Sequence, residues 1–272
     1  MKKMLLVLLT LLAIVIVGCG KKDAQTGTSS DAESKIIKVG ATPVPHAEIL
    51  NAIKDDLAAK GYTLEIKEFT DYVTPNEALN NGEIDANFFQ HVPYMESFVK
   101  DKGFKLVSAA KIHVEPLGLY SKKFKSIEEL PEGASIAIPN DPSNGGRALI
   151  LLQSKGLIKL KDNAGLAATE ADIAENPKNF KFKALEAAQL PRTLADVDAS
   201  IINGNYALES GLNPVKDAIL LEGADSPYAN IIAVKEGSEN SEKIKALVEV
   251  LQSEKVKKFI SEKYNGGVVP AF

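Results

Sequence analysis

Three polar segments hold the side chains best suited to binding a small molecule. The first comprises residues 71–77 and 85–94, the second residues 139–147, and the third residues 203–207 and 226–230. A guanidinium in the second segment can hold a carboxylate through two parallel hydrogen bonds, and carboxamides can donate to a carboxylate or accept from an ammonium. The aromatic rings suit an apolar or thioether side chain. This chemistry fits a zwitterionic amino acid with a soft apolar tail.

Signs of catalysis or metal binding are weak. The sequence has no GxGxxG, Walker A, GxSxG or HExxH motif. His46, His91 and His113 have no second His or Cys at the spacing of metal ligands, so we assign His46 and His113 structural roles and predict neither a metal site nor a cofactor. We therefore predict a binding protein and not an enzyme.

The elements that must position these segments alternate between strand and helix patterns. We predict strands at 36–40, 62–69, 84–86, 105–110, 135–139, 199–202, 218–221 and 230–234, and helices at 46–60, 76–81, 93–102, 142–154 and 241–263. This alternation is typical of an α/β fold. The polar segments follow predicted strands, and open α/β sheets bind ligands where strands end.

The length of the chain and two breaks in its pattern predict two lobes. A break near residues 116–125 and a return near 225–230 assign residues 36–118 to lobe 1, 119–225 to lobe 2 and 226–272 again to lobe 1. Two passages between lobes would form a hinge and a cleft suited to closing around a small ligand.

The N-terminal residues have the pattern of a targeting segment. Lys2 and Lys3 precede an apolar run, residues 4–17, that is shorter than the roughly 20 residues of a membrane-spanning helix. We predict a signal peptide at 1–18, because the run ends in small residues before Cys19 and resembles the lipobox of bacterial lipoproteins. A lipidated Cys19 followed by a flexible tether to residue 35 would anchor the chain outside the cytoplasmic membrane.

Composition excludes several other classes of protein. The chain has 272 residues, of which 45% are hydrophobic and 25% are charged, with a net charge of −4 and no basic stripe. These values fit a globular protein and argue against a nucleic-acid partner. One cysteine cannot form an internal disulfide.

Longer motifs carry a resemblance to a known family. They are FTDYVTPNEAL, GEIDANFFQHVPY, IPNDPSNGGRALILLQ, GLIKLKD, NPKN, QLPR, NGNYA, SPYAN and YNGG. Together with the lipobox they resemble the NlpA family of methionine-binding lipoproteins. The resemblance implies a type II periplasmic-binding-protein fold, methionine in the cleft between the lobes, and delivery to an ABC permease with a cytoplasmic ATPase. We expect a monomer.

The resemblance also implies roles for individual residues. Arg147 resembles the arginine that grips the ligand carboxylate, and we expect it to be solvent-accessible in an open form. Asn203 and Asn230 resemble the carboxamides that hold the amino-acid backbone, with Asn144 supporting the nearby loop. We expect four rings to form the wall around the thioether, those of Tyr72, Phe89, His91 and Tyr94.

Other roles remain open for several of these side chains. Tyr94 could belong partly to the core, and His91 could cap the helix that follows it. Phe88 is expected in the core, while Asn205 and Tyr206 suit turn and packing roles. Other functions also remain open: a lipoprotein of the same fold could bind a methionine-containing dipeptide or another amino acid, or act as a surface adhesion protein.

Overall fold

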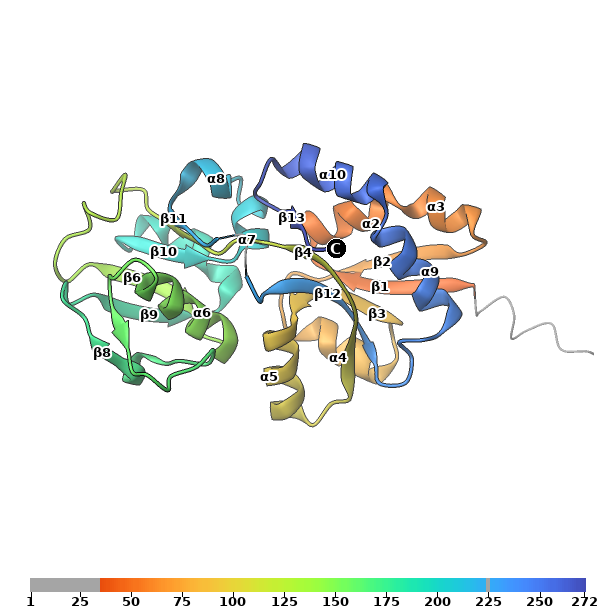
Figure 1. Cartoon of the computed structure of the whole chain (residues 1–272), viewed down its shortest axis with the longest axis horizontal. Coiled ribbons are helices and arrows are strands. Elements are labelled where there is room, and N and C mark those ends of the chain that lie inside the picture. The colour runs from red at the N-terminus through yellow and green to blue at the C-terminus, as the bar shows by residue number, and fades with distance from the viewer. Residues whose placement is uncertain (1–34, 224–225) are drawn as a thin grey trace, which may run out of the picture.

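The chain folds into two lobes, each built on a mixed β-sheet with helices packed on it (Figure 1). The computed structural model describes residues 35–223 and 226–272. Within these ranges no helix has the length and apolar character needed to cross a bilayer. The predicted signal peptide, Cys19 and the tether up to residue 34 lie outside the described residues. The predicted two-lobed α/β class agrees with this architecture.

Lobe 1 contains a six-stranded sheet in the order β13-β4-β12-β3-β1-β2. β1 pairs in parallel with β2 and β3, whereas β12 runs antiparallel to β3 and β4. The strands are β1 (Ile36–Ala41), β2 (Thr63–Glu68), β3 (Ala86–His91), β4 (Leu106–Val114), β12 (Ala229–Lys235) and β13 (Val269–Pro270). The helical segments are η1 (Pro43–Ala47), α2 (Glu48–Ala52), α3 (Lys54–Ala59), α4 (Thr74–Asn81), α5 (Val92–Lys102), α9 (Glu242–Leu251) and α10 (Glu254–Tyr264).

Lobe 2 contains a five-stranded sheet in the order β11-β5-β10-β6-β9. The strands are β5 (Gly118–Tyr120), β6 (Ser135–Pro139), β9 (Lys181–Leu185), β10 (Ala199–Ile202) and β11 (Ala218–Leu221), with a separate β7 (Lys159–Leu160) and β8 (Ile173–Glu175) pair. The helical segments are α6 (Pro142–Gln153), η2 (Glu170–Asp172), η3 (Ala187–Ala195), α7 (Gly204–Glu209) and α8 (Pro214–Asp217). β6 and β10 are parallel neighbours, so the loops after both open at the same edge.

The chain passes between the two sheets twice. The first connection joins β4 to β5 through residues 115–117, and the second joins β11 to β12 through residues 222–228, of which 224 and 225 are not described. The predicted lobe boundary after residue 118 lies one residue inside β5, and the boundary after 225 lies within the second connection. Both connections therefore join the lobes at the space between them.

Each lobe has its own apolar core. In lobe 1, residues of β1, α2, α3 and α9 bury their side chains together, including Ile37, Leu50 and Leu247. Phe88 is fully buried in this core, as expected. In lobe 2, Leu149 and Leu152 of α6 pack on β6 and β10. Two separate cores are what allow two lobes to move as rigid bodies about short connections.

Three predicted elements differ from the structure. The long helix at 241–263 is two helices, because Ser253 has extended backbone and its hydroxyl accepts from the N–H of Val256 to begin α10. The helix at 46–60 is broken at Ile53, and the break keeps Leu50, Ile53 and Leu57 in one core. The strand at 84–86 lies instead at 86–91, where buried Asn87 and Gln90 satisfy each other and Asn76.

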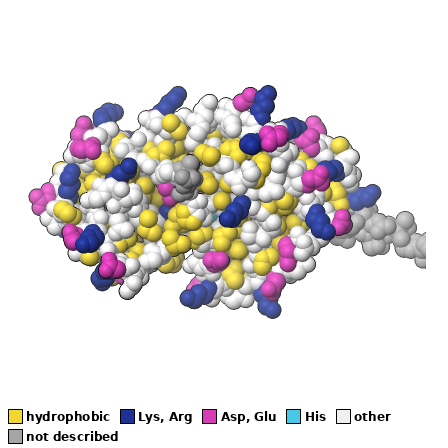
Figure 2. Space-filling model, in the orientation of Figure 1, with side chains coloured by type: hydrophobic (Ala, Val, Ile, Leu, Met, Phe, Trp, Pro, Cys, Tyr) yellow, Lys and Arg dark blue, Asp and Glu magenta, His cyan; other side chains and the backbone are white. Residues whose placement is uncertain are grey.

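The visible face of the molecule carries mixed charge. In Figure 2 the Lys and Arg side chains are interspersed with Asp and Glu over both lobes, and no continuous basic band crosses this face.

Candidate functional site

A narrow cavity lies between the lobes and is lined by residues of both. The structure brings all eight sequence-predicted ligand residues around it. Its lining consists of Tyr72, Phe89, Gln90, His91, Tyr94, Glu115, Asn144, Arg147, Asn203, Gly204, Asn205 and Asn230. Sequence reasoning therefore missed Gln90, Glu115 and Gly204 and gave Asn205 a turn role.

The aromatic end of the cavity is formed by Tyr72, Phe89 and Tyr94 of lobe 1. Their ring centroids are 5.7 to 6.0 Å apart with tilted or edge-on geometry, the arrangement that aromatic quadrupoles favour. Tyr206 of lobe 2 packs on Tyr72 with centroids 5.0 Å apart, which agrees with its predicted packing role. Tyr94 is buried and also contacts Phe98, so it serves the core and the cavity together.

His91 joins the aromatic end to lobe 2. It is the N-cap of α5, where its Nδ1 accepts a hydrogen bond from the backbone N–H of Tyr94. Burial, and then the charge of Arg147, lower the pKa of His91 to about 3, so the ring is neutral at pH 7. Its Nε2–H therefore donates to Oδ1 of Asn144, 3.1 Å away across the cleft. His91 therefore both caps α5 and lines the cavity.

Arg147 is held rigidly in lobe 2. It lies on α6, whose first turn is capped by Asp141, and Gly146 packs so tightly that a Cβ there would lie 2.2 Å from the carbonyl oxygen of Leu166. The guanidinium donates from Nε and Nη2 to the Glu222 carboxylate at 3.0 and 2.5 Å. It also stacks over Tyr228 at 4.3 Å.

That Arg147 is solvent-accessible in an open form stays a prediction, because hydrogen bonds join the two lobes across the cleft in this structure. The residue is 3% exposed because Glu222, Tyr228 and the carbonyl oxygen of Glu115 surround its guanidinium. Among the described residues, its Nη1 makes no hydrogen bond, which leaves donors for a ligand carboxylate.

Carboxamides from both lobes complete the polar end of the cavity, which we define as Glu115, Arg147, Asn203, Asn205 and Asn230. Asn144 supports it, since its Oδ1 accepts from Nδ2 of Asn203 and its own Nδ2 donates to Asp141. Oδ1 of Asn203 and Nδ2 of Asn205 are buried and have no partner within the described ranges. Buried polar atoms are normally satisfied, so these two atoms mark where a polar ligand group would bind.

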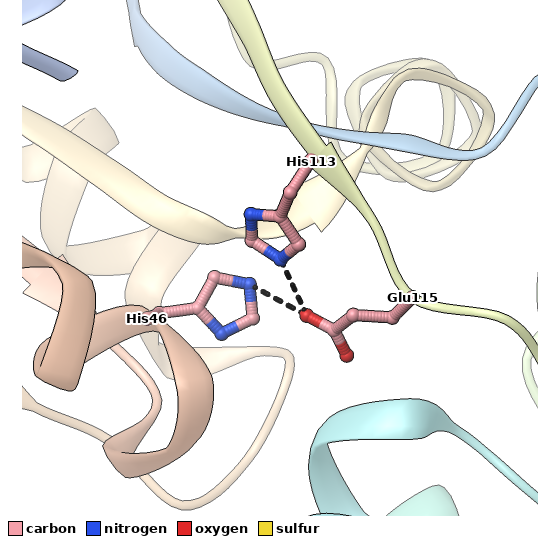
Figure 3. A group of neighbouring side chains, drawn as sticks. All are labelled: His46, His113 and Glu115. Atoms are coloured by element: carbon pink, nitrogen blue, oxygen red, sulfur yellow. Dashed lines mark hydrogen bonds and ion pairs between the residues drawn. The ribbon is translucent and has the colours of Figure 1, made fainter. Parts of the chain in front are cut away.

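His46, His113 and Glu115 form a buried cluster beside the cavity (Figure 3). Oε1 of Glu115 lies 2.7 Å from Nε2 of His113 and 3.2 Å from Nε2 of His46. Burial lowers the pKa of His46 to about 4 and that of His113 to about 3, and it raises the pKa of Glu115. Sequence spacing gave no hint of this group, because its members come from η1, β4 and the first connection between lobes.

The cluster contains the donor types of a metal site, with ligand atoms within 4.8 Å of one another. Nε2 of His46 also faces Oδ1 of Asn230 at 3.1 Å, and its Nδ1 faces the hydroxyl of Thr42 at 2.7 Å. Two oxygen acceptors around Nε2 place the proton there, and Nδ1 then accepts from Thr42. The ring thus directs a proton, and not a lone pair, at Glu115, which is the geometry of a carboxylate–imidazole network.

Comparison with known proteins assigns a family to this architecture. The model of the NlpA lipoprotein family matches residues 37–272. The D-methionine-binding lipoprotein MetQ of Salmonella typhimurium is 44% identical, over 94% of this chain and 93% of that protein. The methionine-binding lipoprotein MetQ of Bacillus subtilis is 46% identical, over 99% of each chain.

Solved structures agree in fold. A nutrient binding protein from Burkholderia cenocepacia bound to methionine superposes with a TM-score of 0.84 at 51% identity, over 87% of this chain and 100% of that one. A structure of the methionine binding protein MetQ gives a TM-score of 0.85 at 45% identity, over 88% of this chain and 99% of that one.

Proposed function

The chain belongs to the NlpA lipoprotein family, and from this premise we propose that it captures methionine between its lobes and delivers it to the permease of an ABC importer with a cytoplasmic ATPase. It is a transport binding protein and not an enzyme. The observation that carries the proposal is a single cavity with an aromatic end and a polar end, lined by both lobes. A methionine-bound relative at 51% identity supports the choice of ligand.

The polar end suits the amino-acid backbone of methionine. The free Nη1 of Arg147 is available to donate to the carboxylate, while its Nε and Nη2 remain fixed by Glu222. The unpartnered Oδ1 of Asn203 accepts from the ammonium, and Nδ2 of Asn205 donates to the carboxylate. Oδ1 of Asn230 adds an acceptor beside His46. Each polar group of the ligand thereby gains hydrogen bonds to the protein in place of those that it loses to water in the closed cavity.

The aromatic end suits the thioether. Sulfur and methyl groups pack favourably against aromatic edges and faces, at about 0.3–1.5 kcal/mol per sulfur contact. Tyr72, Phe89 and Tyr94 offer such surfaces, and the hydroxyls of both tyrosines are already bonded within the protein. A polar side chain would find no unpaired hydroxyl on these two tyrosines.

Calorimetry on protein stripped by unfolding and refolding tests this assignment. Methionine, in both enantiomers, should bind about 5- to 150-fold more tightly than glutamine, because burying an unpaired amide costs about 1–3 kcal/mol. Mass spectrometry of natively purified protein should detect carried-over methionine. Equal binding of glutamine, or carry-over of a methionine-containing dipeptide, would move the assignment to the alternative ligands.

We further propose that lipid on Cys19 anchors the chain to the extracytoplasmic face of the membrane, that residues 1–18 are a signal peptide, and that the protein acts as a monomer. Two acyl chains on one cysteine suffice for stable anchoring, and a tether raises the effective concentration of the protein at its permease. Cys19→Ser should abolish lipid labelling and release the protein from membranes. A variant that still fractionates like wild type would exclude anchoring through this thiol.

A further inference from the structure

Glu115 is the carboxylate at the polar end of the cavity that lacks a cationic partner. Arg147 is the cation of the cavity lining, and its side-chain ion pair is with Glu222. Across residues 35–223 and 226–272, no lysine or arginine forms an ion pair with Glu115, and its carboxylate pairs with the two histidines. Burying a carboxylate without a counter-charge is costly, so its surroundings must explain why it is there.

The donors around Glu115 come from both lobes. Nε2–H of His113 and Nε2–H of His46 face Oε1 from lobe 1. From lobe 2, the backbone N–H of Asn205, in the first turn of α7, lowers the pKa of Glu115 and so favours its charged form. Burial is the larger effect and raises the pKa of Glu115. These donors oppose that shift, since each forms a stronger hydrogen bond with the ionised carboxylate than with the neutral acid.

Charge neutrality at the polar end is then incomplete without a ligand. The two histidines are neutral, and Arg147 with Glu222 forms a balanced pair. An ionised Glu115 would add one uncompensated negative charge facing the cavity. A ligand ammonium is the group that removes this imbalance, and it lies on the same molecule as the carboxylate assigned to Arg147.

We propose that His46 and His113 are positioning residues that hold Glu115 as an ionised carboxylate facing the cavity, where it is the counter-charge for the ligand's α-ammonium. This inference rests on the proposed amino-acid ligand and extends it: the site discriminates for a free α-amino group. Methionine analogues without that group should therefore bind weakly even though their carboxylate and thioether are intact.

The test compares methionine with 4-(methylthio)butanoate, which has hydrogen in place of the ammonium. Wild-type protein, stripped of ligand, should prefer methionine by about 30-fold or more, because the analogue leaves Glu115 unpaired in a closed site. Glu115→Gln should remove most of that preference. His113→Leu removes one N–H donor and should reduce the preference by about 10-fold or more.

Two variants separate positioning from structure. His113→Gln retains an N–H near the position of Nε2 and should keep the preference within about threefold of wild type. Ile112→Ala, at the neighbouring core position on β4, should lower the melting temperature and leave the preference unchanged. His46→Leu should act in the same direction as His113→Leu.

The outcomes are distinct. If His113→Leu weakens both ligands by the same factor, or His113→Gln is no better than His113→Leu, the positioning role is overturned while methionine binding stands. A stoichiometric transition metal in the wild-type protein that is lost in His113→Leu would also overturn it, since the histidines would then be metal ligands. Failure of the wild type to bind methionine would overturn the proposed function together with this inference.

Discussion

The two ends of the cavity differ in how far their own contacts satisfy them. At the aromatic end, the rings of Tyr72, Phe89 and Tyr94 pack on one another, and both tyrosine hydroxyls donate within the protein. At the polar end, Asn203 and Asn205 each bury a polar atom without a partner in the part of the chain that the structure describes.

This difference predicts that the aromatic end determines which side chain fits, whereas the polar end determines most of the affinity. Packed rings are already organised and define which side chain fits, so a change there should alter binding moderately. Each unsatisfied buried polar atom costs about 1–3 kcal/mol until a ligand bonds to it, so the polar end should dominate affinity. The rings come from lobe 1 alone, whereas the polar end is assembled from both lobes: Arg147, Asn203 and Asn205 lie in lobe 2, and Asn230 lies on β12 of lobe 1.

Arg147→Ala should show the largest effect and is the strongest test of this contrast. Loss of the guanidinium leaves the ligand carboxylate without its cation in a closed site, which costs about 2–5 kcal/mol, or about 30-fold to several thousandfold in affinity. Because Arg147 is also the partner of half-buried Glu222, we expect the ligand-free protein to lose stability. Calorimetry and a thermal melt of the same stripped sample measure the two effects.

The control for Arg147→Ala is Arg147→Lys, which keeps the charge without the planar fork and should recover part of the affinity. A folded Arg147→Ala protein that binds methionine within threefold of wild type would place the carboxylate clamp elsewhere.

Gly204→Ala should be next in size and tests how the polar end closes. A Cβ at Gly204 would lie 2.7 Å from Cβ of Glu115, so α7 of lobe 2 could not approach the connection that carries Glu115 as closely. Such overpacking typically costs about 1–3 kcal/mol, which corresponds to about 5- to 150-fold weaker binding. Titration calorimetry gives the affinity, and solution scattering shows whether ligand still reduces the radius of gyration.

Ala207→Ser, a small addition on the same helix, is a comparison for Gly204→Ala, because residue 207 is buried in the lobe 2 core away from the cavity lining. It should affect stability more than closure. Wild-type affinity and compaction in Gly204→Ala would show that the lobes close without this close approach.

The sequence predicted the lining of the cavity better than its electrostatics. The polar segments after β6 and β10 could be placed because parallel strands end at a common edge, and this brings Arg147 and Asn203 to the cavity. Strand β3 was placed too early because Asn87 and Gln90 look like loop residues, and only a buried network with Asn76 makes them compatible with a buried strand.

Glu115 and Glu222 could not be predicted because each lies in a connection between lobes with no regular pattern. Their partners, His113 for one and Arg147 for the other, depend on how the two sheets face each other. The isolated acid in HVEPLG was the available signal, since a charge among apolar residues requires a partner.

His91 connects the two ends, and its titration provides a third, smaller test. Its pKa is about 3 when folded and near 6.5 when unfolded, so the unfolded chain binds a proton first as the pH falls, and stability is lost below about pH 6.5. Between pH 7 and pH 5 this amounts to about 2 kcal/mol at about 1.4 kcal/mol per pH unit. His91→Asn keeps an N-cap for α5 and should reduce the difference in unfolding free energy between those pH values by this amount.

Urea denaturation of ligand-free wild type and His91→Asn at pH 7 and pH 5 measures that difference. His46 and His113 remain in both proteins and contribute equally to each. An unchanged pH dependence in His91→Asn would mean that His91 is protonated in the folded protein, and its bond to Asn144 would then need another assignment.

The smallest predicted effect belongs to the hydroxyl of Tyr72, at the aromatic end. It donates to Oδ1 of Asn205 at 2.5 Å and so joins the lobes without being assigned to the ligand. Tyr72→Phe keeps the ring and removes one hydrogen bond, with a net value of about 0.5–1.5 kcal/mol, or about 2- to 13-fold in affinity. Because this bond stabilises the closed arrangement of the lobes, the affinities for methionine and for 4-(methylthio)butanoate should fall by the same factor.

Tyr94→Phe is the matched control, since that hydroxyl bonds to the Tyr72 carbonyl within lobe 1 and should change affinity less. If Tyr72→Phe lowers the affinity for methionine alone, this hydroxyl binds the ligand ammonium. The aromatic end would then share the electrostatic role assigned here to the polar end.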